Sequence, residues 1–318
     1  MTLRLEIHNR PALASALVVI CFCVSCADVT KQKSSLANME NQIHDGNDEE
    51  SVRMLFPTAP GSIFRLGTRN PNSSSNFQIE KMTTASRHVE SGIQFWRISA
   101  HDLKYASGGF GKTSRLHIYA GGARQLYTWK TQTGFLSSPA DIRNQEFTAF
   151  ARVQGISDPK RAAISLKIRG GAHSEKNPDW ASCAMLTFQA ATTGAVARFG
   201  KELVHPIYDY VRLTPRFDSA LVEGRWVGLK LVSYSSPREA GHVVNRLYLD
   251  TDPFNPATGK PRNEWKLFAE FIDVEGASTG RYTKLVNWGG WQTTLRTDGV
   301  DRLDFTLISL RAIVPPSP

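Results

Sequence analysis

Residues 163–174 combine an alternating stretch with charged side chains and a histidine, the residue types that bind a polar ligand or exchange protons with it. Aliphatic side chains at 164, 166 and 168 alternate with a polar side that includes Lys167 and Arg169. This period of two is that of a half-buried β-strand. Two glycines and then His173 follow the strand. Such a face suits an acidic or hydroxyl-rich ligand; the alternative is an ordinary solvated face of an antiparallel sheet.

A second pair of candidates lies in the stretch 115–120, where His117 and Tyr119 point to the same side of a predicted strand. With Arg169 and His173 they form the candidate catalytic set. Their chemistry would be β-elimination on a uronate: a cation neutralises the carboxylate and acidifies the adjacent C–H, while a histidine or tyrosine transfers the proton. The alternative is that His117 and Tyr119 are cross-strand packing residues.

Further candidates would bind the substrate rather than transform it. The stretch 204–210 holds a histidine, two tyrosines and a proline, and we expect a loop there that lines the rim of a sugar site. In the Trp-Gly-Gly-Trp tract at 288–291, the glycines leave room for a pyranose to stack on an indole, although such rings also serve as packing anchors. The candidate substrate-binding residues are Lys167, Arg152, His205, Tyr208, Arg246, Tyr248, Trp288 and Trp291.

Short strands must position these residues, because no long amphipathic helix is evident in the sequence. The predicted strands are bounded by Gly, Pro, Ser or Asn. They cover residues 77–82, 92–98, 115–120, 125–129, 146–153, 163–169, 183–188, 195–199, 225–234, 243–250, 265–272, 293–296 and 303–311. So many strands in one domain predict an all-β fold, a two-sheet antiparallel β-sandwich of the jelly-roll type. We expect the last strand to pair near the first ones.

Four tracts carry a resemblance to a known fold family: residues 224–234, 247–252, 288–298 and 304–313. Together they resemble the concanavalin-A-like lectin/glucanase jelly roll, and in particular its secreted alginate-lyase-like, carbohydrate-associated members. The resemblance covers roughly residues 90–313 and rests on strand rhythm. It implies a carbohydrate ligand and, in the lyase members, β-elimination. The Gln-Ile-His triplet of alginate lyases is replaced here by Leu116-His117-Ile118, and the alternating carboxylates of the glucanases are absent.

The N-terminal 26 residues have the layout of a signal peptide, with basic residues ahead of an apolar run at 12–24. The run ends in Cys-Val-Ser-Cys, which resembles a bacterial lipoprotein cleavage box and makes Cys26 the expected lipid-bearing residue. Plain cleavage to a secreted protein is the alternative. We expect residues 27–55 to be a polar tether and residues 56–318 to be a single jelly-roll domain.

The net charge of the chain indicates which classes of ligand to expect. The chain carries a net +9, and residues 27–53 are acidic, so the predicted domain is more cationic than the whole. For an exported protein this favours an anionic polysaccharide; we expect no nucleic-acid partner and membrane contact only through the lipid anchor. Cys183 is the only cysteine after residue 26, and we interpret it as a small buried hydrophobe.

No cofactor or metal is expected. The acidic turn at 250–255 has the oxygen ligands of a calcium site, but prolines interrupt it and the glycine and glutamate of a calcium loop are missing, so a hairpin is favoured. Three hypotheses for function stay open: a carbohydrate-binding protein localised to the cell envelope or outside the cell, a polysaccharide lyase, and a structural envelope lipoprotein.

Overall fold

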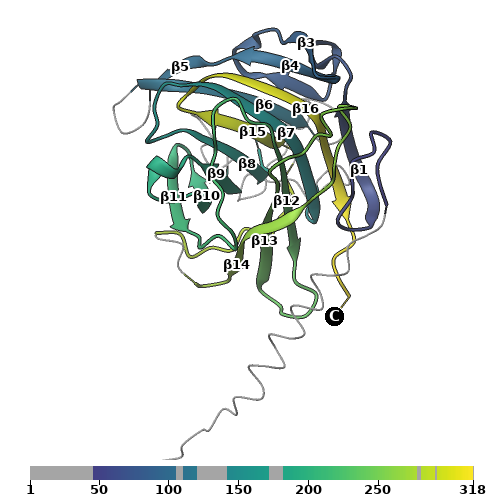
Figure 1. Ribbon diagram of the computed structural model, residues 1–318. Helices are drawn as coiled ribbons and strands as arrows, with labels where there is room; N and C mark the ends of the chain where they lie inside the picture. Colours follow the sequence, from purple (N-terminus) through teal and green to yellow (C-terminus); the bar gives the residue numbers. More distant parts are fainter. Residues whose placement is uncertain are drawn as a thin grey trace, which may run out of the picture. The chain divides into compact units, whose positions relative to one another are not determined.

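The computed structural model describes residues 46–104, 110–119, 142–171, 182–277, 281–290 and 292–317. The chain divides into two units, Met1–Gln42 and Ile43–Pro318, and all described residues belong to the second. That unit is built from two antiparallel sheets, which we call sheet I and sheet II (Figure 1). Helical structure in the described residues is limited to three short 3-10 turns, η1 (Pro71–Ser73), η2 (Glu80–Met82) and η5 (Ala191–Thr193).

Sheet I joins strands from both ends of the domain. Its order is β14 (Lys266–Val274), β13 (His242–Asp250), β12 (Val227–Ser235), β7 (Gln145–Ile156), β16 (Val300–Ile313), β4 (Ile93–Ser99) and β3 (Ser86–Glu90). Strand β1 (Thr58–Gly67) also pairs with β16. The C-terminal strand therefore returns beside the first strands, as its hydrophobic alternation predicted.

Sheet II carries most of the candidate residues. Its order is β11 (Ile207–Arg212), β10 (Ala197–Val204), β9 (Cys183–Gln189), β8 (Ala163–Gly170), β15 (Gln292–Asp298), β6 (Phe110–Tyr119) and β2 (Phe77–Ile79). Strand β5 (His101–Lys104) pairs with β6. The labels from β11 to β6 follow this succession in Figure 1. The stretch that we expected to be a loop at 204–210 is instead the β10–β11 hairpin.

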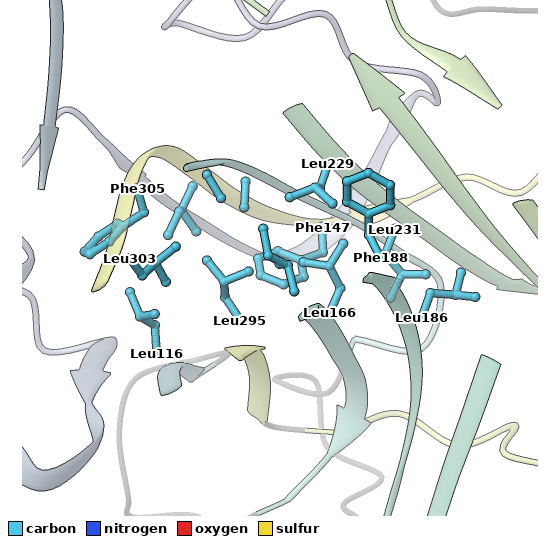
Figure 2. Packing of buried hydrophobic residues seen from close by; sticks show 14 of the residues in the cluster. Leu116, Phe147, Leu166, Leu186, Phe188, Leu229, Leu231, Leu295, Leu303 and Phe305 are labelled. Carbon is cyan, nitrogen blue, oxygen red and sulfur yellow. The ribbon is translucent and has the colours of Figure 1, made fainter. Parts of the chain in front are cut away.

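The two sheets bury their aliphatic faces against each other. In sheet II the pairing places four leucines side by side across neighbouring strands, Leu116, Leu295, Leu166 and Leu186. Figure 2 shows these leucines in one line facing side chains of sheet I. All four are at most 1% exposed. Burial of this apolar area is the main force that holds the sheets together, and it confirms the predicted two-sheet antiparallel sandwich.

The outer face of sheet I bears a second apolar cluster, around Phe95, Phe150 and Trp265. Residues 46–56 pack against it, and Val52 and Leu55 are buried there. The compact unit therefore begins before residue 56, in a stretch that we had assigned to the tether. The predicted strand at 125–129, the signal peptide and most of the tether lie outside the described residues.

Candidate functional site

The outer face of sheet II is polar along its width, because alternate residues of each strand turn away from the core. Paired positions on neighbouring strands form one continuous row. From β2 to β11 this row is Gln78, His117, Thr294, Lys167, Met185, Gly200 and Tyr210. His117 and Lys167 thus flank Thr294 from the two adjacent strands. The register brings together residues that are far apart in the sequence.

His117 and Tyr119 lie at one end of this face, with amide groups beside them. His117 Nδ1 lies 3.0 Å from Thr294 Oγ1 and accepts from Gln292 Nε2 at 3.0 Å. Because an amide nitrogen only donates, Nδ1 is an acceptor and the neutral ring carries its proton on Nε2. The Tyr119 hydroxyl donates to Gln78 Oε1 at 2.8 Å. The two ring centroids are 6.4 Å apart, so the expected pairing of these side chains on one face is confirmed.

Lys167 and Tyr208 form a second polar centre on the same face. Lys167 Nζ donates to Glu202 Oε2 at 2.8 Å and to the Tyr208 hydroxyl at 3.2 Å. Arg296 Nη1 also donates to the Tyr208 hydroxyl, at 3.2 Å. His205 Nδ1 lies 2.7 Å from Glu202 Oε1, so the histidine at the hairpin turn reaches this centre through a shared carboxylate.

The charge states of this centre follow from its burial and its partners. Burial alone would lower the pKa of Lys167, but the ionisable groups of Cys183, Glu202 and Tyr208 outweigh it and raise that pKa above its ordinary value. Burial also raises the pKa of Tyr208, against the opposing effect of Lys167. At neutral pH the amine is therefore charged and the phenol keeps its proton, so Tyr208 can donate a proton or a hydrogen bond.

Arg169 does not lie on this face, which corrects the alternation expected from the sequence. Its backbone adopts a positive φ of 57°, beside a register shift between β8 and β15. The bulge turns the side chain inward, where it is 0% exposed. There Nε donates to Ser233 Oγ at 3.1 Å and Nη1 to the Trp288 carbonyl at 3.0 Å. Burial lowers the pKa of Arg169 to about 9.

Trp288 is held in return by the same residue, because its Nε1 donates to the Arg169 carbonyl at 3.0 Å. The indole is half-buried and packs against the main hydrophobic core. Lys284 Nζ lies 5.7 Å from its ring centroid. Trp288 therefore anchors the end of the sandwich, which is the packing alternative that we considered for the tract at 288–291.

Three further candidate residues belong to the opposite sheet. Arg152, Arg246 and Tyr248 lie on the outer face of sheet I, where each is embedded in local contacts. Arg152 donates to both Glu90 carboxylate oxygens at 2.9 Å. Arg246 pairs with Glu270, and Tyr248 packs against the second apolar cluster. These residues cannot share a ligand with Lys167, because the two sheets face away from each other.

His173, Trp291 and Cys26 lie outside the described residues. Sequence reasoning missed several members of the face: Gln78, Glu202, Gln292, Thr294 and Arg296. No alternation marks the last three, because residues 292–298 are polar at every position except Leu295. The sequence also does not encode the register that places these residues between β6 and β8.

Within the described ranges, no group of three or more His, Cys, Asp or Glu side chains could hold a metal ion.

The described part of the chain contains no helix long and apolar enough to cross a membrane. No family model matches the sequence, and no curated protein matches it either. Solved structures with a partly similar fold exist, at 12% identity or less.

One similar structure is the carbohydrate-binding module CBM66 from Bacillus subtilis, at 10% identity over 68% of this chain and 95% of that chain, with a TM-score of 0.35. Another is an endo-β-1,4-glucuronan lyase from the fungus Trichoderma reesei, at 12% identity over 78% and 94%, with a TM-score of 0.44. A third is the exoplasmic/lumenal domain of VIP36 in a Ca²⁺- and mannose-bound form, at 10% identity over 76% and 85%, with a TM-score of 0.39.

Proposed function

We propose that this protein is an exported, lipid-anchored carbohydrate-binding protein that holds a polysaccharide on the outer face of sheet II. The observation that carries the proposal is the row of outward-facing residues from Gln78 to Tyr210. It contains an amide, a histidine, a hydroxyl, a lysine and an aromatic ring, and it is interrupted by Met185 and Gly200. Sugars are bound by this combination, because amides and hydroxyls exchange hydrogen bonds with sugar hydroxyls while aromatic rings cover the apolar C–H face.

The face is pre-organised for such a role. Gln292, His117 and Thr294 are linked by hydrogen bonds of 3.0–3.2 Å, and Lys167 and Arg296 are paired with Glu202 and Asp298. Side chains already held in place lose little conformational entropy when a ligand binds. Because these two cations are matched by carboxylates, hydrogen bonding rather than excess charge would dominate recognition at the centre of the face.

The binding proposal is tested by retention of the purified chain on immobilised polysaccharides, both anionic and neutral. Gln292→Ala should weaken retention about tenfold, as expected for loss of a buried hydrogen-bonding group. Gln154→Ala on sheet I removes the same side chain at a half-buried position and should leave retention unchanged. Equal effects of both variants, or no retention of the wild-type chain, would refute the proposal.

Export and lipid anchoring rest on the N-terminal sequence alone. In bacterial cells supplied with a labelled fatty acid, we expect label on the wild-type chain and none on Cys26→Ser. Label on both proteins would exclude Cys26 as the anchor.

A polysaccharide lyase is the second candidate, because proton-transfer groups lie on the same face. In β-elimination, Lys167 or Arg296 would neutralise the uronate carboxylate. His117 would take the proton from the adjacent carbon at Nδ1, which must first give up its hydrogen bond from Gln292. The C–O bond to the leaving sugar breaks as the C=C bond forms, and the hydroxyl of Tyr119 or Tyr208 returns a proton to the departing oxygen. Burial raises the pKa of Tyr208, so its hydroxyl is protonated at neutral pH.

The lyase candidate predicts new ultraviolet absorbance from an unsaturated uronate when the chain is mixed with a uronate polysaccharide. His117→Ala, Tyr119→Phe or Tyr208→Phe should reduce its rate by 10²-fold or more, in the range of general acid–base catalysis. Retention without absorbance would leave the binding protein as the function. A structural envelope protein would show neither retention on polysaccharides nor new absorbance.

A further inference from the structure

The ring of Tyr210 contacts the backbone of sheet II at Gly200, at the end of the polar row. Tyr210 pairs with Gly200 on β10, and a Cβ built on Gly200 would lie 2.8 Å from the Tyr210 ring carbons Cδ1 and Cε1. The ring occupies the space that a side chain at position 200 would need. Even so, Tyr210 remains 42% exposed. One side of the aromatic ring is therefore seated on the sheet, and part of the ring is accessible to a ligand.

The ring of Tyr210 has an aromatic neighbour on β11 and a charged neighbour on β15. The rings of Tyr208 and Tyr210 are almost parallel, with an interplanar angle of 7° and centroids 6.0 Å apart. Burial raises the pKa of the Tyr210 hydroxyl above its ordinary value, against the opposing charge of Arg296. The phenol therefore stays neutral at physiological pH.

Two arginines border Tyr210 on the same face. Arg198 and Arg212 are paired residues of β10 and β11, each two positions from the Gly200–Tyr210 pair. The guanidinium carbon of Arg198 lies 5.8 Å from the Tyr210 ring centroid. Burial lowers the pKa of Arg198, and the nearby charge of Arg212 lowers it further. The two cations repel each other, which an anion between them would relieve.

These arginines differ from the other cations of the face. Lys167 is paired with Glu202 and Arg296 with Asp298. Neither Arg198 nor Arg212 has a carboxylate partner among the described residues, and Arg198 Nε is buried without a hydrogen-bond acceptor. The nearest acidic residue in sequence, Asp209, is bound by Arg281 on the other side of the hairpin. Positive charge without a matching carboxylate is therefore found at the β10–β11 end of the face.

We infer that Tyr210, Arg198 and Arg212 form a subsite for one uronic acid unit of an acidic polysaccharide, an inference that rests on the proposed binding function. The pyranose ring stacks its C–H face on Tyr210, and its carboxylate accepts hydrogen bonds from the flanking guanidinium groups. Such a subsite would give the face a preference for acidic glycans, which its charge-matched centre would not provide.

The test compares each acidic oligosaccharide with its own methyl ester, which keeps the sugar ring and removes the charge. Calorimetric titration of the full chain uses oligomers of alginate, polygalacturonate and glucuronan, each in both forms. We expect the wild-type chain to bind at least one acid at least tenfold more tightly than its ester. R198Q/R212Q should bind acid and ester equally, with the ester affinity unchanged.

Two further variants separate stacking from charge. Tyr210→Ala should weaken binding of acid and ester alike by about tenfold, because the ring covers the sugar whatever its charge. The control R225Q/R238Q removes two exposed arginines elsewhere and should keep the wild-type preference. Unchanged circular dichroism and thermal midpoints verify that each variant is folded.

The outcomes distinguish the subsite from the function on which it rests. If the wild-type chain binds these sugars but R198Q/R212Q keeps the preference for acid, or if R225Q/R238Q loses it equally, the subsite is refuted and the binding function stands. If the wild-type chain binds esters and neutral glycans as tightly as acids, the subsite is likewise refuted. Absence of binding to every glycan refutes both.

Discussion

On the outer face of each sheet an aromatic ring packs over a glycine, but the two rings differ in how far they are exposed to solvent. On sheet I, the Trp265 ring lies over Gly228, where a Cβ would be 2.7 Å from a ring carbon, and Lys230 Nζ is 4.5 Å from a ring centroid of that indole. On sheet II, the Tyr210 ring lies over Gly200. Trp265 is 8% exposed, whereas Tyr210 is 42% exposed. An aromatic ring that packs over a glycine is therefore part of the buried structure on sheet I, whereas on sheet II it is exposed enough to contact a ligand.

The difference arises from what covers sheet I. Residues 46–56 cross its outer face, and the Leu55 amide donates to the buried Glu146 carboxylate at 3.0 Å. Lys230 and Arg311 pair with the same carboxylate. The charged groups of this network are thus paired within the protein. Polar and aromatic residues alone therefore do not identify a ligand site, because the exposure of each side chain decides. At the centre of sheet II, Thr294 and Lys167 are themselves only 3% and 5% exposed, whereas Tyr210 at its end is accessible.

Glu146→Gln should have the largest effect, because it breaks this buried network and leaves Lys230 and Arg311 without their anionic partner. We expect a loss of about 3–5 kcal/mol in the free energy of unfolding. Urea denaturation measures this loss. Glycan retention by the folded fraction should be unchanged, and a loss of retention without a loss of stability would overturn the division of roles between the sheets.

Arg152→Gln should act in the same direction with a smaller effect. The guanidinium of Arg152 lies between the rings of Phe95 and Trp226, 5.0 and 4.9 Å from their centroids, and bonds Glu90 and Asp304. Losing these charge-assisted bonds should cost about 2–3 kcal/mol of stability, measured by urea denaturation. Retention on acidic glycans should not change. Weaker retention at full stability would instead support our earlier assignment of Arg152 to the ligand site.

The two glycines offer the most direct comparison. Gly228→Ala forces a methyl group against the buried Trp265 and should lower stability by about 1–3 kcal/mol, as overpacking does. Gly200→Ala should cost less than about 1 kcal/mol, because the partly exposed Tyr210 can move away. Only Gly200→Ala should weaken glycan binding, as titration of both variants would show. The reverse pattern would mean that sheet I carries the site.

The smallest expected effect is a pH dependence on the sheet II side. Burial lowers the pKa of His101 from 6.5, with Arg115 also lowering it and Glu80 opposing. The folded state therefore binds this proton less readily than the unfolded state, and stability should fall as pH drops below about 6.5 through the lower folded pKa. His101→Gln should flatten this part of the stability curve in urea titrations at several pH values. An unchanged slope would exclude His101 as its source.

Much of the fold was predictable from hydrophobic alternation. Ile164, Leu166 and Ile168 face the core as their period of two indicates, and His117 and Tyr119 share the opposite face of the same sheet. The bulge at Arg169 was not predictable, because an arginine has no intrinsic preference for a positive φ and the register shift depends on the partner strand. The same holds for the hairpin at 204–212, whose proline indicated a loop.

The sequence by itself determined the layers of this protein, since side-chain period and burial of apolar area depend on local order along each strand. Tertiary structure alone decided the site. Lys167, Tyr208 and Arg296 come into contact only because their strands pair within sheet II. Arg152 and Arg246 lie on the opposite sheet, although their strands carry similar charges. Strand register and sheet membership are set by contacts between distant segments, and no local pattern encodes them.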